Sequence, residues 1–232
     1  MKRIFSLCLA AVLALGIFVL TACEKEPVGP VAYVTIADEN GEIVLAADAT
    51  ALTDVDADGT ITIDDVLKTA HNDNYEGGAD AGFRSETTQW GLSMMKLWGV
   101  ESGGSYGYRV NNVSAMGLTD VVKEGDHVYA YIYTDTVTFS DTYSFFDQVT
   151  VSAAKGESVT LTLMQAGYDE NWNPLNVACD GAVIYINGET SDITTDASGK
   201  ATVALDKKGE YVITAEKDGV NLVPPVCVIN VK

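Results

Sequence analysis

The chain has 232 residues, of which 14 are basic and 33 are acidic, and its formal net charge is −19. A field of that sign repels nucleic acid and anionic lipid headgroups, so we exclude DNA and RNA as partners. Apolar residues make up 47% of the chain, which is too many for a disordered acidic tail, and the length suffices for two modest domains.

The first 22 residues predict a secretory signal, because two basic residues precede an apolar run at positions 4–20. The run ends in LTAC, residues 20–23, which resembles the lipobox of bacterial lipoproteins. The resemblance implies that Cys23 receives acyl chains, becomes the new N-terminus and anchors the protein to the membrane. The expected location is the extracellular face of the bacterial cytoplasmic membrane. An uncleaved N-terminal anchor is the alternative, and it places the remaining chain on the same side.

The segment after the signal predicts a short tether and then a hairpin. Residues 23–32 are polar and contain two prolines, which is typical of a linker. Two β-rich runs follow on either side of Asp-Glu-Asn-Gly at 38–41, and such a turn between strands predicts a β-hairpin.

Residues 54–65, DVDADGTITIDD, carry the strongest motif. Calcium takes six to eight oxygen ligands, and the twelve-residue loop that suits it supplies them from positions 1, 3, 5, 7, 9 and 12, with glycine at position 6. Gly59 is the sixth residue here, and the six ligand positions hold Asp54, Asp56, Asp58, Thr60, Thr62 and Asp65. Thr60 is expected to offer its carbonyl and Thr62 to hold a water.

Position 12 is aspartate, and no apolar helix precedes the loop, so the motif resembles a calcium loop of the dockerin type, present once. We predict one calcium ion as cofactor, in a structural and not a sensing role. A solvated acidic turn is the alternative. The surroundings favour a cation, because twelve acidic residues lie between Asp38 and Asp80, where Lys68 is the only basic one.

The next segments predict one helix and several strands. Residues 63–75 are expected to be helical because Val66, Leu67 and Ala70 share one face. Residues 76–87 are expected to form a loop. Strands are expected within residues 90–100, 105–113 and 126–134.

The layout from Tyr33 to Tyr133 resembles the domain family that supplies the C-terminal domain of transcobalamin and intrinsic factor. The matching segments are ITIDDVLKTAH, WGLSMMKLWGV as a central strand, SYGYRVNN and LTDVVKEGDHVYAYIY. The resemblance implies an α+β domain over residues 33–146, with a small β-grasp-like mixed sheet crossed by one helix. In cobalamin carriers this domain covers one side of a corrinoid.

Residues 147–232 predict an all-β immunoglobulin-like sandwich, because short period-two runs alternate with turn sequences. The segment from GAVIYING to GEYVITAEKDG is similar to bacterial immunoglobulin-like or transthyretin-like modules. Cys179 and Cys227 lie in this part, and two cysteines outside the membrane allow one disulfide. Two buried free thiols are the alternative.

Aromatic residues on neighbouring predicted strands form a candidate ligand face. They are Trp98, Tyr106, Tyr108, Tyr129 and Tyr131. If exposed, they would make a flat platform for a glycan or a corrinoid. If buried, they would be cross-strand packing.

The sequence contains no coherent catalytic constellation. GGSYG at 103–107 has the pattern of a nucleophile elbow but precedes a strand, whereas an elbow leads into a helix. His71 and His127 have no neighbouring cysteine, so no zinc signature is present.

We therefore predict a non-enzymatic cell-surface lipoprotein for binding or adhesion, stabilised by one calcium ion. Its expected partners are the membrane, through the lipid on Cys23, and a surface protein, glycan or corrinoid. Extracellular capture of a corrinoid or glycan on the aromatic face is one alternative, and a structural surface spacer is the other.

Overall fold

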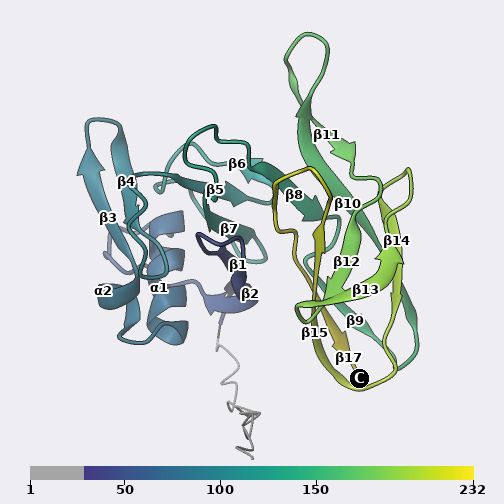
Figure 1. Cartoon of the computed structure of the whole chain (residues 1–232). Coiled ribbons are helices and arrows are strands. Elements are labelled where there is room, and N and C mark those ends of the chain that lie inside the picture. Colours follow the sequence, from purple (N-terminus) through teal and green to yellow (C-terminus); the bar gives the residue numbers. More distant parts are fainter. Residues whose placement is uncertain (1–28) are drawn as a thin grey trace, which may run out of the picture.

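The computed structural model describes residues 29–232, which are mostly β-sheet arranged in several sheets, with two short helices (Figure 1). The predicted signal segment, the predicted lipidation site Cys23 and most of the predicted tether lie outside the described residues. Among residues 29–232, no helix is long and apolar enough to cross a membrane.

The N-terminal lobe, residues 29–134, is built on one mixed sheet with the strand order β2-β1-β7-β5-β6. β1 and β7 are parallel, and the other neighbours are antiparallel. α1 packs against this sheet, and β3 and β4 form a separate two-stranded ribbon. The elements are β1 (Val31–Ala37), β2 (Ile43–Ala51), α1 (Ile63–Asn74), α2 (Gly78–Gly82), β3 (Arg84–Thr88), β4 (Gly91–Lys96), β5 (Tyr106–Val110), β6 (Val113–Ser114) and β7 (His127–Ile132).

The predicted hairpin and helix are confirmed as β1–β2 and α1. Val66, Leu67 and Ala70 are fully buried against the sheet, as their spacing requires. Thr62 is the N-cap of α1 and Asp65 is its third residue, and each side chain bonds the other's backbone N–H. This capping box fixes where the helix begins.

Two expectations for this lobe are wrong. The segment expected to be a loop contains α2 and β3, because the buried Phe83 anchors it to the core despite its polar composition. β4 is not central, since it pairs with β3 alone in the described structure. Trp98 and Gly99 adopt positive φ angles of 48° and 82° in a tight turn after β4, which backbone hydrogen bonds between Leu97 and Val100 close.

The C-terminal lobe, residues 142–232, consists of two five-stranded sheets. One has the order β11-β10-β8-β16 with β14 also on β10, and the other has the order β13-β12-β15-β17-β9. The strands are β8 (Thr142–Phe146), β9 (Thr150–Ala153), β10 (Ser158–Tyr168), β11 (Pro174–Ala178), β12 (Val183–Ile186), β13 (Glu189–Thr194), β14 (Lys200–Ala204), β15 (Gly209–Glu216), β16 (Leu222–Val223) and β17 (Cys227–Val231).

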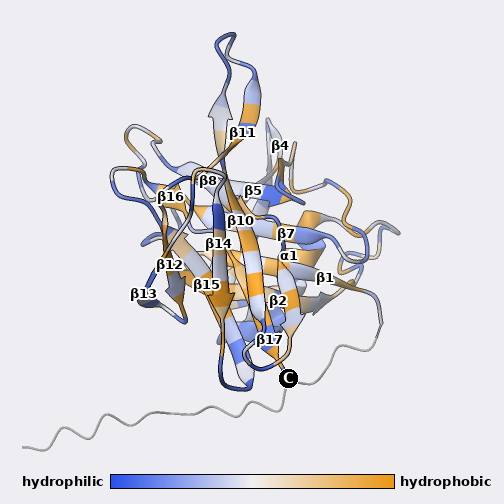
Figure 2. Ribbon diagram, turned by 90° about the vertical axis from the view of Figure 1, so that its right-hand side faces the viewer, coloured by the Kyte–Doolittle hydropathy of each residue, from blue (hydrophilic) through white to orange (hydrophobic). Residues whose placement is uncertain are grey.

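Alternating side chains from both sheets build the core of this lobe. Leu161 and Leu163 of one sheet share a buried cluster with Ile184, Ile213 and Ile229 of the other. Figure 2 shows the matching bands of hydrophobic and hydrophilic residues along β10. The period of two in the sequence therefore follows from burial of one face of each strand.

The change from one lobe to the other falls earlier than the predicted boundary at residue 147. β8 lies before that boundary, yet it pairs with β10 and β16. Phe146 of β8 also belongs to the core of the C-terminal lobe. Residues 135–141 thus connect the lobes, and β8 joins a sheet of the C-terminal lobe through long-range pairing.

A tyrosine layer, formed by Tyr129, Tyr131, Tyr133, Tyr143 and Phe145, packs between the lobes. The ring of Tyr143 on β8 lies 5.7 Å from that of Tyr129 and 6.1 Å from that of Tyr131, both on β7. The Tyr129 hydroxyl donates to the Pro224 carbonyl, and the Tyr143 hydroxyl donates to Asn112 Oδ1 at 2.9 Å. Both hydrogen bonds join the two lobes.

Gly107→Ala is expected to destabilise the protein by about 2 kcal/mol, because overpacking a closed core forces strain. Gly107 lies opposite Tyr131 in the β5–β7 register, and an added Cβ overlaps the Tyr131 ring. The ring is 4% exposed and has little room to move. Urea denaturation measures the loss.

Gly117→Ala is the matched control, since its Cβ would meet the nearest atom at 3.7 Å, an ordinary contact. Its effect should stay within about 0.5 kcal/mol. Equal stability of the two variants would contradict the close packing of the tyrosine layer.

Candidate functional site

The predicted calcium loop lies between β2 and α1, and three of its six predicted ligands come together. One carboxylate oxygen from each of Asp54, Asp56 and Asp58 lies within 4.8 Å of the others. Gly59 has a φ of +91°, which gives the sharp turn that glycine at position 6 provides. Ile61, two residues later, packs against the core of the lobe.

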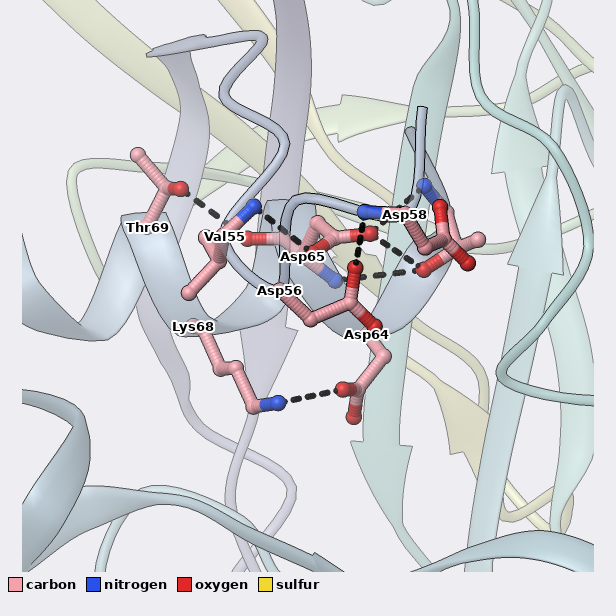
Figure 3. Close-up of polar contacts among 8 residues, drawn as sticks. Val55, Asp56, Asp58, Asp64, Asp65, Lys68 and Thr69 are labelled. Atoms are coloured by element: carbon pink, nitrogen blue, oxygen red, sulfur yellow. Dashed lines mark hydrogen bonds and ion pairs between the residues drawn. The ribbon is translucent and has the colours of Figure 1, made fainter. Parts of the chain in front are cut away.

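Backbone amides hold these carboxylates inside the loop. Asp54 accepts from Asp58 N at 3.2 Å and from Gly59 N at 2.8 Å. Asp56 accepts from Asp58 N at 3.2 Å (Figure 3), and Asp58 accepts from Thr60 N at 2.8 Å. Since each carboxylate oxygen has two lone pairs, these bonds orient the groups and leave capacity for a cation.

The structure does not bring Asp65 and Thr62 into this carboxylate group. Asp65 is 2% exposed, and its oxygens accept from Val55 N at 3.0 Å, Thr62 N at 3.0 Å and Thr62 Oγ1 at 2.6 Å (Figure 3). Both residues are thus engaged in the capping box. The signal was present in the sequence as a Thr and an Asp three residues apart at the start of a helix.

The loop concentrates negative charge at the protein surface. Partial desolvation raises the pKa of Asp56, and the neighbouring carboxylates of Asp58 and Asp65 add to the rise against an opposing hydrogen bond from the Asp58 amide. Lys68 on α1 is paired with Asp64 at 2.6 Å (Figure 3), so its positive charge is already engaged outside the group of Asp54, Asp56 and Asp58. A divalent cation would supply the missing positive charge.

The five aromatic residues of the candidate ligand face do not share one surface. Tyr106 is buried in the N-terminal core, and Trp98 and Tyr108 pack against that core. Tyr129 and Tyr131 lie in the tyrosine layer and are 1% and 4% exposed. The β5–β7 register places Tyr106 and Tyr108 opposite Ile132 and Ala130. Successive residues of β7 point to opposite faces of the sheet, so Tyr129 and Tyr131 lie on the other face. Packing accounts for these side chains, and they form no open platform.

Cys179 and Cys227 are free and buried in the core of the C-terminal lobe. The predicted disulfide is therefore absent from the structure. The structure instead has the two buried free thiols that were the alternative. Burial raises the pKa of both thiols, that of Cys227 to about 12, which keeps them protonated and unreactive.

The two histidines are buried in the N-terminal lobe. His71 Nε2 accepts from Trp98 N at 3.1 Å, so Nδ1 carries the proton and donates to the Leu67 carbonyl at 2.7 Å. His127 Nε2 lies 2.8 Å from Thr35 Oγ1. Burial lowers the pKa of each to about 4, so both are neutral supports of the fold at pH 7.

No family model fits the chain, and the search of curated proteins finds no relative. The resemblances to the transcobalamin C-terminal family, to dockerin loops and to immunoglobulin-like modules therefore remain predictions.

Stability should fall as the pH drops from about 6.5 to about 4, partly through His71. Its folded pKa of about 4 lies below the unfolded value of 6.5, so its contribution is complete above 6.5 and is lost as the pH falls through 4. At 1.36 kcal/mol per pH unit the contribution is about 3 kcal/mol.

Urea titrations of the wild type and of His71→Gln across this range test the assignment. The variant should be less stable at pH 7 but lose less stability on acidification, because glutamine does not titrate. Parallel curves for the two proteins would contradict it.

Proposed function

We propose that the chain is a non-enzymatic cell-surface lipoprotein for binding or adhesion, with one calcium ion stabilising its N-terminal lobe. The observation that carries the proposal is the group formed by Asp54, Asp56 and Asp58 at the entry to α1. Hard carboxylate oxygens around a glycine turn are the donor set that calcium prefers.

In this proposal the three aspartates, the Thr60 carbonyl and water hold the ion, and Asp65 supports the loop by accepting from the Val55 amide. When bound, calcium supplies positive charge that joins the end of β2 to the start of α1. Both elements contribute to the same core, so the ion acts as a structural staple and not as a reaction centre.

The architecture supports a binding or spacing role. We propose a β-grasp-like N-terminal lobe, on the parallel β1–β7 pair crossed by α1, and an immunoglobulin-like C-terminal sandwich. Burial of the candidate aromatic face favours adhesion over corrinoid or glycan capture at that place. The LTAC sequence at 20–23 supports the lipid anchor.

Calcium should stabilise the metal-stripped mature protein by about 2–3 kcal/mol at a hundredfold excess over its Kd, through mass action on the folded state. Extracellular sites of this kind have a Kd of about 10⁻⁴ to 10⁻³ M. Calorimetric titration and urea denaturation with and without calcium measure both quantities.

Asp58→Asn should remove the heat and the stabilisation, whereas Asp73→Asn, an exposed acid on α1 outside the loop, should keep both. If the wild type gives no heat at millimolar calcium, the loop is a solvated acidic turn and not a calcium site.

Cys23→Ser should abolish incorporation of labelled palmitate and release the protein from the membrane fraction, because the acylated thiol is lost. Cys8→Ser, a change within the signal segment, is the matched control and should leave both unchanged. Retained label in Cys23→Ser would contradict the lipid anchor.

A further inference from the structure

A groove of about 840 Å³ lies between the two lobes. One wall is the β1–β2 turn with the start of β2, residues 40–46, and the other comes from β12, β15 and residues 220–224. This volume falls within the range of about 300–1,000 Å³ typical of small-molecule sites, which form preferentially where domains meet.

Contacts between the lobes hold the walls of the groove in place. Asn221 Nδ2 donates to Thr134 Oγ1 at 2.8 Å, and both residues line the groove. Pro224, also in the lining, accepts from the Tyr129 hydroxyl of the tyrosine layer. The groove is therefore part of the packed structure, and a ligand would find it preformed.

Hydrogen-bonding groups face the groove from both lobes. The Tyr185 hydroxyl donates to Glu216 Oε2 at 2.9 Å, which orients both side chains. A carboxylate has two oxygens, so Glu216 can accept from a ligand while it holds this hydroxyl. Glu42 lines the opposite wall and is exposed. Asn187, two residues after Tyr185 in the sequence, also lines the groove.

The lining disfavours anions and carries little net charge. Glu42 and Glu216 repel anions, and the whole chain is strongly acidic. Lys217 lies in the same wall as Glu216 and offsets the charge of one of these two carboxylates. Ile43 and Leu222 add apolar surface between these polar groups.

We propose that this groove binds a neutral oligosaccharide. Its hydroxyl groups would donate to the carboxylates and amides, and the apolar faces of its sugar rings would cover Tyr185 and Leu222. The inference rests on the proposed function in one respect, since it gives a surface-binding protein its ligand class and site. The site is distinct from the aromatic strand face, which is buried.

Calorimetric titration of the mature protein with hexasaccharides from starch, cellulose, xylan, mannan and chitin tests this inference, with spermine and a heparin hexasaccharide as charged probes. At least one neutral sugar should bind. Glu216→Gln and Tyr185→Phe should weaken that binding by about five- to tenfold, the effect of losing one hydrogen bond.

Matched controls are Glu189→Gln and Tyr168→Phe, exposed residues outside the groove, which should bind as the wild type does. Thermal melts verify that each variant is folded.

Binding of no neutral sugar, binding of spermine or heparin instead, or equal sugar binding by groove and control variants would each overturn the inference. Calcium titration of the same preparation separates the two proposals. Intact calcium binding without sugar binding rejects the groove ligand alone, whereas loss of calcium binding rejects the metal-supported fold.

Discussion

The packing of Tyr129 and Tyr131 against Tyr143 is the interaction on which the arrangement of the molecule depends. β7 is buried along its whole length, with Val128, Ala130 and Ile132 in the N-terminal core and its tyrosines against the other lobe. Arg109 adds to the layer, since its guanidinium carbon lies 4.0 Å from the centre of the Tyr143 ring. The layer covers Tyr129 and Tyr131, and the Tyr129 hydroxyl holds Pro224 in the wall of the groove.

A second constraint acts at the start of α1, where one carboxylate has two tasks. Asp65 caps the helix and holds the Val55 amide, so it ties the acidic loop to the core before any ion binds. A cation at Asp54, Asp56 and Asp58 would then relieve repulsion on a loop whose shape is already set. The loop is thus ordered by its own amides and would, under the proposed function, still gain stability from calcium.

Features specified by local sequence were predictable. The β1–β2 turn, the start and apolar face of α1, the alternation of the C-terminal strands and the spacing of the acidic loop all depend on neighbours within about twelve residues. Burial of β7 on both faces depends on a strand of the other lobe. The assignment of β8 and the separation of β4 from the main sheet are likewise long-range outcomes that no local pattern contains.

The candidate sites divide in the same way. The aspartates of the loop lie within five positions of one another, so their meeting was readable from spacing. The groove joins residues near 40 to residues near 185 and 216, which come together through contacts between the lobes that include the tyrosine layer and the Asn221–Thr134 hydrogen bond. Tyr106 and Tyr108 alternate on β5, and Tyr129 and Tyr131 alternate on β7, so each pair shares one face of its own strand. The register between β5 and β7 places the two pairs on opposite faces of the sheet, and that register is a long-range outcome.

We infer that the tyrosine layer joins the two lobes into one rigid body. Backbone ¹⁵N relaxation of the mature protein can show this, because rotational diffusion is read separately from each lobe. A single correlation time, that of the whole protein, is expected for amides in both lobes. Two shorter and unequal correlation times would show independent tumbling and would contradict both the layer and the fixed groove beside it.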